Sequence, residues 1–356
     1  INTRSFGEDP VKVADKVIAY ASGLESGKVL SVCKHFPGHG DTDVDSHKAL
    51  PVLPFTRERL DSVELYPFKE AIRAGVSGMM VGHLQVPVIE PIGDLPSSLS
   101  RNVVYGLLTE ELAFKGLIFT DALAMKGVAG NKSVCLQALQ AGNDMVLAPR
   151  RLKEEMDAVL EAVEKGELPE EEINAKCRKV LTYKYILGLE RKPFVKLSGL
   201  GTRINTPQTR DLISRLNLAA ITVLNNKNDV LPLHPDLKEA AILNVGKPEE
   251  IEPFDRKMKK YTSFARFQLR KDLPEAEQQK LRDSLAAYRR VIVTVTEQRL
   301  APYQSFFAKF APESPVIYVF YTPAKSMLQI QRAVSAAEAV VLAHASRDDV
   351  QERVAD

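Results

Sequence analysis

Residues 29–47 have the sequence VLSVCKHFPGHGDTDVDSH, which joins an apolar run to a loop crowded with ionisable side chains. The apolar part, Val29–Cys33, is typical of a short buried strand. The loop, Lys34–His47, holds three of the six histidines and three aspartates, with two glycines and a proline to bend the backbone. Burying so many ionisable groups for packing alone is costly. Catalytic and binding side chains often lie on loops that follow a rigid strand, so we interpret this loop as a functional site.

Three kinds of site match the residue types in this loop. A metal site could use the His-x-x-x-His or Asp-x-Asp-x-Asp spacing. However, Ser46 and Val52 stand where a calcium loop needs its turn glycine and its bidentate glutamate, and the proline and glycines exclude a helical histidine pair. The glycine spacing also matches neither nucleotide-phosphate fingerprint. Acid–base chemistry fits best, with Asp45 orienting His47 and raising its basicity.

A second signal is the segment Gly116–Met125, GLIFTDALAM, another apolar strand that ends on one carboxylate, Asp121. An aspartate at the carboxyl end of a barrel strand is where a catalytic group is expected. The alternative is that Asp121 caps the following helix. Taken together with the loop at 34–47, the segment favours a catalytic role for Asp121.

Helix and strand patterns alternate regularly along the first 150 residues, and two charged helices close the segment. Strands are expected at 29–33, 77–82, 117–120 and 144–148, and helices at 9–24 (Asp9 as N-cap, Pro10 at the first position), 56–74, 100–115, 131–141, 151–165 and 170–186. This order predicts a parallel sheet covered by helices. Only four βα units are present, whereas a (β/α)8 barrel needs eight. We therefore expect the carboxyl-terminal half of a TIM-type barrel over residues 1–190, with the other units before Ile1 and no activity from residues 1–356 alone.

A linker and a second domain are expected after the barrel. Residues 191–207 are rich in Pro, Gly and polar side chains, which is typical of a linker. Residues 208–356 alternate helical stretches with strand-like runs at 219–224, 239–245, 290–295, 315–321 and 338–343. This pattern predicts a doubly wound α/β domain, which we expect to be incomplete at Asp356.

The motifs together resemble glycoside hydrolase family 3, in its β-N-acetylglucosaminidase branch. That branch carries a Lys-His-Phe-Pro-Gly-His-Gly…Asp-Ser-His loop, which Lys34–His47 matches almost continuously, with Pro51 following. Its nucleophile lies in a Ser/Thr-Asp-x-Leu-x-Met segment, matched by Thr120–Met125, and its Arg-Ser-Phe-Gly segment is matched by Arg4–Gly7. The resemblance is strong over about residues 1 to 190. It is weaker from about 205, where segments 220–226 and 230–233 resemble the start of the family's α/β sandwich domain.

The resemblance implies a retaining mechanism through a covalent glycosyl-enzyme, with no cofactor and no metal. Asp121 would be the nucleophile, and His47, paired with Asp45, the general acid and then the general base. Arg4, Lys34 and His35 would hold hydroxyls of the terminal sugar. Most retaining enzymes use two carboxylates, whereas this branch uses a histidine as acid–base. His39 is expected to be structural, and His83, which ends another apolar run, is a further candidate for lining the site.

Composition excludes several other classes of protein. The net charge of +2 and the dispersed Lys and Arg residues give no reason to expect nucleic-acid binding. No apolar run reaches 18 residues, so no membrane-spanning helix is expected. The three cysteines, Cys33, Cys135 and Cys177, lie in apolar periodic segments and are interpreted as buried thiols.

The predicted function is a retaining exo-β-N-acetylglucosaminidase acting on terminal N-acetylglucosamine in peptidoglycan fragments (muropeptides) or chitin-type oligosaccharides. Alternatives within the family are a β-glucosidase, a β-xylosidase, or a phosphorylase in which phosphate replaces water. Alternatives of another class are a catalytically inactive carbohydrate-binding protein and a metal-dependent hydrolase. The segment starts at Ile1 without a signal-like stretch, so cell envelope, periplasm and cytoplasm all stay open as compartments.

Overall fold

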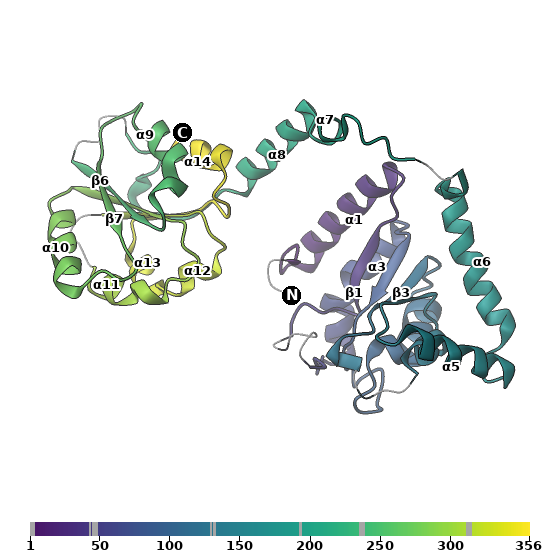
Figure 1. Cartoon of the computed structure of the whole chain (residues 1–356). Coiled ribbons are helices and arrows are strands. Elements are labelled where there is room, and N and C mark those ends of the chain that lie inside the picture. Colours follow the sequence, from purple (N-terminus) through teal and green to yellow (C-terminus); the bar gives the residue numbers. More distant parts are fainter. Residues whose placement is uncertain are drawn as a thin grey trace. The chain divides into compact units, whose positions relative to one another are not determined.

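The computed structural model describes residues 4–42, 44, 49–128, 130, 133–191, 194–234, 239–310 and 315–356. The chain divides into two compact units, Ile1–Val195 and Lys196–Asp356 (Figure 1). Each unit is built around its own sheet, and the two are described separately below. Within the described ranges, no helix combines the length and the apolar character needed to cross a bilayer.

The first unit contains a four-stranded, entirely parallel sheet in the order β1-β2-β3-β4. Its strands are β1 (Val32–Phe36), β2 (Gly78–Val81), β3 (Leu117–Ala122) and β4 (Met145–Leu147). Parallel order brings the carboxyl ends of all four strands to one edge, which is where the loop after β1 and Asp121 of β3 lie. The predicted alternation of strands and helices is therefore confirmed for these four strands. The expected strand at 29–33 is displaced toward the carboxyl end, because the ladder with β2 begins at Val32 and runs on to Phe36.

Helices connect and cover these strands. They are α1 (Pro10–Ser26), α2 (Arg57–Arg59), α3 (Tyr66–Arg73), α4 (Val134–Ala141), α5 (Leu152–Glu164) and α6 (Glu170–Ile186), with π-helical turns η2 (Leu60–Glu64) and η4 (Asn102–Glu111) and short 3-10 turns. The predicted cap of α1 is confirmed: the Asp9 side chain accepts the amides of Val11 and Lys12, and Pro10 begins the helix. Helix α1 packs against α3 and β1 (Figure 1).

The core of the first unit lies between the sheet and these helices. Phe36, Met79 and Val81 of the strands are fully buried and pack with Leu107 and Leu108 of η4. Each such side chain contributes about 1.5–3 kcal/mol of burial free energy. This packing fixes the strand ends that carry the predicted site residues.

Asp144 is part of this scaffold. Its Oδ2 accepts the Ile118 amide at 2.8 Å and Lys179 Nζ of α6 at 2.6 Å, and its side chain is almost fully buried. These contacts tie the segment before β4 to β3 and α6.

Asp144→Ala should therefore lower the free energy of unfolding by about 3 kcal/mol, because it leaves a buried amide and an ammonium without their acceptor. Asp157→Ala is the matched control. It breaks the exposed ion pair with Lys153 on α5 and should cost less than about 1 kcal/mol. Urea unfolding of both variants checks this, and equal losses would contradict a structural role for Asp144.

The second unit has a six-stranded sheet in the order β5-β10-β9-β8-β6-β7, in which only β5 is antiparallel to its neighbour. The strands are β5 (Thr222–Asn226), β6 (Ala240–Val245), β7 (Ala265–Leu269), β8 (Arg290–Val295), β9 (Val316–Phe320) and β10 (Ala339–Leu342). Five of these were predicted. Strand β7 was missed because its sequence, ARFQL, carries Arg266 and Gln268 at alternate positions.

Helices lie on both faces of this second sheet. Alternate residues of β6, β8 and β9 belong to two separate cores. One core contains side chains of α9 (Glu252–Met258) and α14 (Asp348–Ala355), and the other those of α10 (Glu275–Ala286), α11 (Gln304–Lys309) and α13 (Gln331–Ala336). The remaining helices are α7 (Leu200–Ile204), α8 (Pro207–Ala220) and α12 (Lys325–Leu328). The arrangement agrees with the predicted doubly wound pattern.

Candidate active site

A β-bulge at the end of β1 turns His35 toward the neighbouring strands. Lys34 pairs with Met80 and Phe36 with Val81, so His35 is the extra residue on its strand. The His35 side chain is buried, and its Nε2 lies 3.7 Å from Oδ2 of Asp121, which comes from the end of β3. The structure thus brings together two of the predicted site residues that are 86 positions apart in sequence.

Asp121 is oriented by its own strand end. Oδ1 accepts the amide of Ala122 at 2.8 Å, which leaves Oδ2 on the side of His35. The Asp121 side chain is mostly buried, with 16% of its surface exposed. The amide that Oδ1 accepts is that of the next residue in the strand, which is not the bond of a helix cap.

Burial lowers the pKa of His35 from 6.5 to about 4, although the negative charge of Asp121 opposes this change and Lys34, His39 and Arg4 reinforce it. His35 is therefore neutral at pH 7. Its Nδ1 is buried and has no hydrogen-bond partner among the described residues.

The lowered pKa of His35 predicts how stability depends on pH. The unfolded chain binds this proton near pH 6.5 and the folded chain only near 4, so folding is favoured fully above 6.5 and progressively less as the pH falls toward 4. We expect the thermal midpoint of the first unit to decrease over this range, and His35→Gln to make the decrease shallower. Parallel midpoint curves for the two proteins would contradict this origin of the pH dependence.

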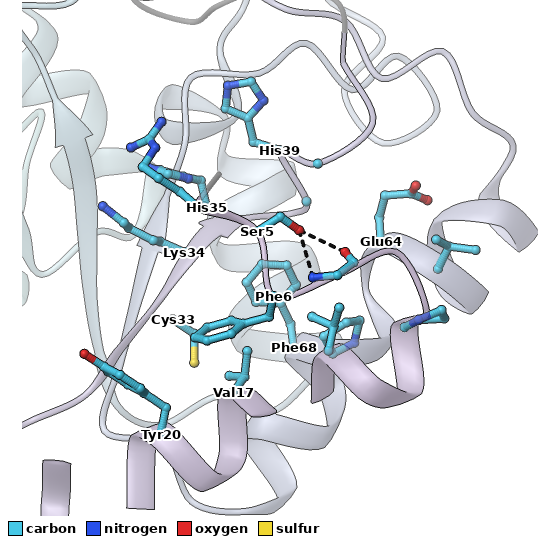
Figure 2. Close-up of a pocket in the computed structure, with 18 of the residues that line it drawn as sticks. Ser5, Phe6, Val17, Tyr20, Cys33, Lys34, His35, His39, Glu64 and Phe68 are labelled. Carbon is cyan, nitrogen blue, oxygen red and sulfur yellow. Dashed lines mark hydrogen bonds between the residues drawn. The ribbon is translucent and has the colours of Figure 1, made fainter. Parts of the chain in front are cut away.

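A pocket of about 970 Å³ opens beside the loop after β1. Arg4 and Arg59 line it together with the basic side chains of Lys34, His35 and His39. Figure 2 shows Lys34, His35 and His39 with the buried carboxylate of Glu64. The rest of the lining is largely apolar and includes Phe6, Val17, Tyr20, Cys33 and Phe68. Asp121 is not part of this lining, whereas His35 both contacts Asp121 and lines the pocket. The predicted residues Arg4, Lys34 and His35 are therefore together on one pocket.

Glu64 packs against the loop after β1 at Gly38. Gly38 has φ +138°, and a Cβ there would lie 2.7 Å from the Glu64 Cβ, so only glycine fits. Arg59 bridges Asp41 of the loop and Glu64 at 3.0 and 2.9 Å. The His39 ring is buried, bonds Thr42 Oγ1 through Nδ1 at 2.8 Å and meets the His35 ring edge-on. Sequence reasoning missed Arg59 and Glu64, and the expected structural role of His39 is consistent with its bond to Thr42.

His83 follows strand β2 and is almost fully buried. Its Nδ1 is 2.7 Å from Ser98 Oγ, and its Nε2 is 3.0 Å from the carbonyl oxygen of Ala122. Burial lowers its pKa, so the ring is neutral at pH 7. His83 therefore contacts the backbone next to Asp121 and is not among the residues that line the pocket.

The predicted pair Asp45 and His47 lies outside the described residues, so its position relative to Asp121 stays a prediction. Among the residues that the structure does describe, no cluster of three or more His, Cys, Asp or Glu side chains could hold a metal ion.

Comparison with known proteins places the chain in a family. Residues 1–183 match the model described as "Glycosyl hydrolase family 3 N terminal domain", which is more than half of the chain. The chain belongs to glycosyl hydrolase family 3. This family 3 chain is 33% identical over 255 residues to beta-hexosaminidase A of Pseudoalteromonas piscicida, an alignment that covers 65% of the chain and 42% of that protein.

Two further similar proteins have names that match this assignment. Beta-hexosaminidase LpqI of Mycobacterium tuberculosis is 36% identical over 194 residues, which is 52% of the family 3 chain and 49% of LpqI. The solved structure of a family 3 beta-N-acetylglucosaminidase from a Paenibacillus species superposes with a TM-score of 0.77 at 28% identity, over 99% of this chain and 69% of that one. The chain thus spans less than half the length of these two curated relatives.

Proposed function

We propose that this family 3 chain carries catalytic residues of a retaining exo-β-N-acetylglucosaminidase. The substrate class is an oligosaccharide with a terminal N-acetylglucosamine, in muropeptides from peptidoglycan or in chitin-type chains. The observation that carries the proposal is the 3.7 Å approach of His35 and Asp121 from two different strand ends, beside a pocket shared with Arg4 and Lys34. The names of the curated relatives and of the Paenibacillus structure support the same activity.

Asp121 would attack the anomeric carbon through Oδ2, because Oδ1 is occupied by the Ala122 amide. The glycosidic C–O bond breaks while His47 donates a proton to the leaving oxygen, and a glycosyl ester forms on Asp121. In the second step His47 takes a proton from water, the water oxygen attacks the same carbon, and Asp121 leaves as a carboxylate. Asp45 would keep the imidazole of His47 oriented and basic enough for both steps.

Arg4, Lys34 and His35 would bind the hydroxyls of the terminal sugar. His35 Nδ1 is a buried polar atom without a protein partner among the described residues, and such an atom costs free energy unless a ligand satisfies it. Arg4 and Lys34 add donors on the same pocket. Donors fixed around one sugar favour an exo-acting enzyme that binds a chain end.

We further propose that the first unit is part of a (β/α)8 barrel, with the domain over residues 1–190, a linker at 191–207 and the family's α/β sandwich domain over 208–356. The parallel order of β1 to β4, with the site at their carboxyl ends, supports the barrel. The sheet of the second unit, with helices on both faces, supports the sandwich domain. Residues 189–191 form a 3-10 turn and 200–204 the short helix α7 within or beside the proposed linker.

A panel of chromogenic β-glycosides tests the activity on the full-length protein. We expect release of the chromophore from the β-N-acetylglucosaminide in a metal-independent reaction, with much less from the β-glucoside and β-xyloside. Selective cleavage of either of the latter would replace the proposed substrate class. Strong acceleration by inorganic phosphate, with formation of a sugar 1-phosphate, would instead assign a phosphorylase. Binding of oligosaccharides without any cleavage would assign a carbohydrate-binding protein.

A further inference from the structure

Beyond Thr120, strand β3 no longer pairs with β2, although it still pairs with β4 at Ala122. The pairing of β2 with β3 stops at Val81 and Thr120, although β3 continues to Ala122. The Ala122 amide holds Oδ1 of Asp121. The Ala122 carbonyl oxygen accepts a hydrogen bond from Nε2 of His83 at 3.0 Å. At this position the ladder between β2 and β3 no longer supplies a donor. One residue, Ala122, thus connects the carboxylate of Asp121 to the His83 ring.

The hydrogen bonds of His83 define its tautomer. A carbonyl oxygen only accepts, so Nε2 carries the proton and donates to Ala122. The other ring nitrogen, Nδ1, is then an acceptor, and it receives the hydroxyl of Ser98 at 2.7 Å. Both ring nitrogens therefore have a hydrogen-bond partner in the neutral form. Ser98 donates to His83, and His83 donates to Ala122.

A serine run holds His83 on both sides. Ser97 Oγ donates to the carbonyl of Gly82 at 2.8 Å and accepts the amide of Leu84 at 3.2 Å, which fixes the backbone flanking His83. The carbonyl of Ser98 accepts Nδ2 of Asn143 at 2.9 Å. The side chains of Ser97, Ser98 and Asn143 are fully or almost fully buried. The ring therefore has little freedom to move away from Ala122.

We propose that His83 is a positioning residue for Asp121, and that Ser98 fixes the His83 tautomer that this role requires. The inference rests on the proposed function, in which Asp121 is the nucleophile. By holding the Ala122 carbonyl, His83 fixes the residue whose amide orients Oδ1, so that Oδ2 faces the reacting carbon. A misplacement of about 1 Å between reacting groups can cost about 100-fold in rate.

This role differs from that of an ordinary buried histidine in what it predicts for catalysis. A purely structural histidine would affect the amount and stability of folded protein and leave the turnover of each intact site unchanged. A positioning residue lowers kcat per intact site and leaves KM little changed, because Arg4, Lys34 and His35 still bind the sugar. The discriminating measurement is therefore kcat normalised to sites that react with a fluorinated glycoside trap.

Four variants of the full-length protein test the proposal on the chromogenic β-N-acetylglucosaminide. His83→Leu removes both ring bonds in a similar volume, whereas His83→Gln keeps an N–H donor with the reach of Nε2. Ser98→Ala removes the hydroxyl on Nδ1. Ser100→Ala is its matched control, because Ser100 is also fully buried and donates its hydroxyl, but to Glu90 at 2.7 Å and not to His83.

We expect His83→Leu to lower kcat per trapped site by about 10- to 100-fold, with His83→Gln recovering much of this loss. Ser98→Ala should lower kcat by more than Ser100→Ala at similar thermal midpoints. If His83→Leu does not fold, the serine pair decides alone. Equal kcat values for the two serine variants, or no advantage of His83→Gln over a folded His83→Leu, would overturn the role of His83 while the wild type stays active. An inactive wild type would overturn the proposed function and this inference with it.

Discussion

Asp121→Asn is expected to reduce kcat by at least about a thousandfold, the largest effect of any single substitution in the chain. An amide is a poor nucleophile and cannot form the glycosyl ester, so the reaction loses its covalent step. The fold should be retained, because an amide oxygen at Oδ1 still accepts the Ala122 amide. Turnover of the chromogenic β-N-acetylglucosaminide and a thermal melt measure the two properties in the same sample.

A labelling experiment identifies the nucleophile directly. A 2-fluoro analogue slows the second step, so the glycosyl ester should accumulate and its mass should map to the peptide that contains Asp121. Asp157→Asn is the control, since Asp157 is exposed on α5 and pairs with Lys153; it should label and turn over like the wild type. A label on any carboxylate other than Asp121 would refute the assignment.

Much of the fold could be predicted because local sequence patterns and tertiary packing favour the same helices and strands. Asp9 and Pro10 specify the start of α1 by the bonds that a helix end needs. The apolar run at 77–82 becomes β2 because both faces of a parallel strand are covered. The apolar run at 29–33 does not give the correct bounds of β1. Pairing with β2 sets these bounds at 32–36, so Lys34 and His35 belong to the strand and not to the loop.

The loop and Asp121 could be found from the sequence, but the contacts that organise them could not. Ionisable side chains at strand ends give a local signal, whereas the bond from His83 to Ala122 joins positions 39 apart. The Arg59 bridge between Asp41 and Glu64 likewise depends on how the loop packs on η2. Nothing in the segment SSLS at 97–100 distinguishes Ser98 from its neighbours until the His83 ring lies beside it. Such pairs are properties of the packed structure.

The second large effect concerns His47, and it should depend on the leaving group. His47→Ala removes the proton donor, so aryl glycosides with poor leaving groups should lose about 10²- to 10⁴-fold in kcat/KM. Those with good leaving groups need little protonation and should lose far less. Asp45→Asn should show the same trend with a smaller amplitude, because the imidazole remains but is less well oriented and less basic.

His39→Ala is the matched control for this series, because His39 lies in the same loop and its ring bonds Thr42. Any loss it causes should be uniform across the leaving groups, since it transfers no proton in the proposed mechanism. The measurement is a plot of log kcat/KM against leaving-group pKa for the wild type and the three variants. A steep slope only for His47→Ala and Asp45→Asn supports the dyad, because proton donation matters more as the leaving group becomes more basic. Parallel lines for His47→Ala and the wild type would exclude His47 as the general acid, and another group would have to supply the proton to the leaving oxygen.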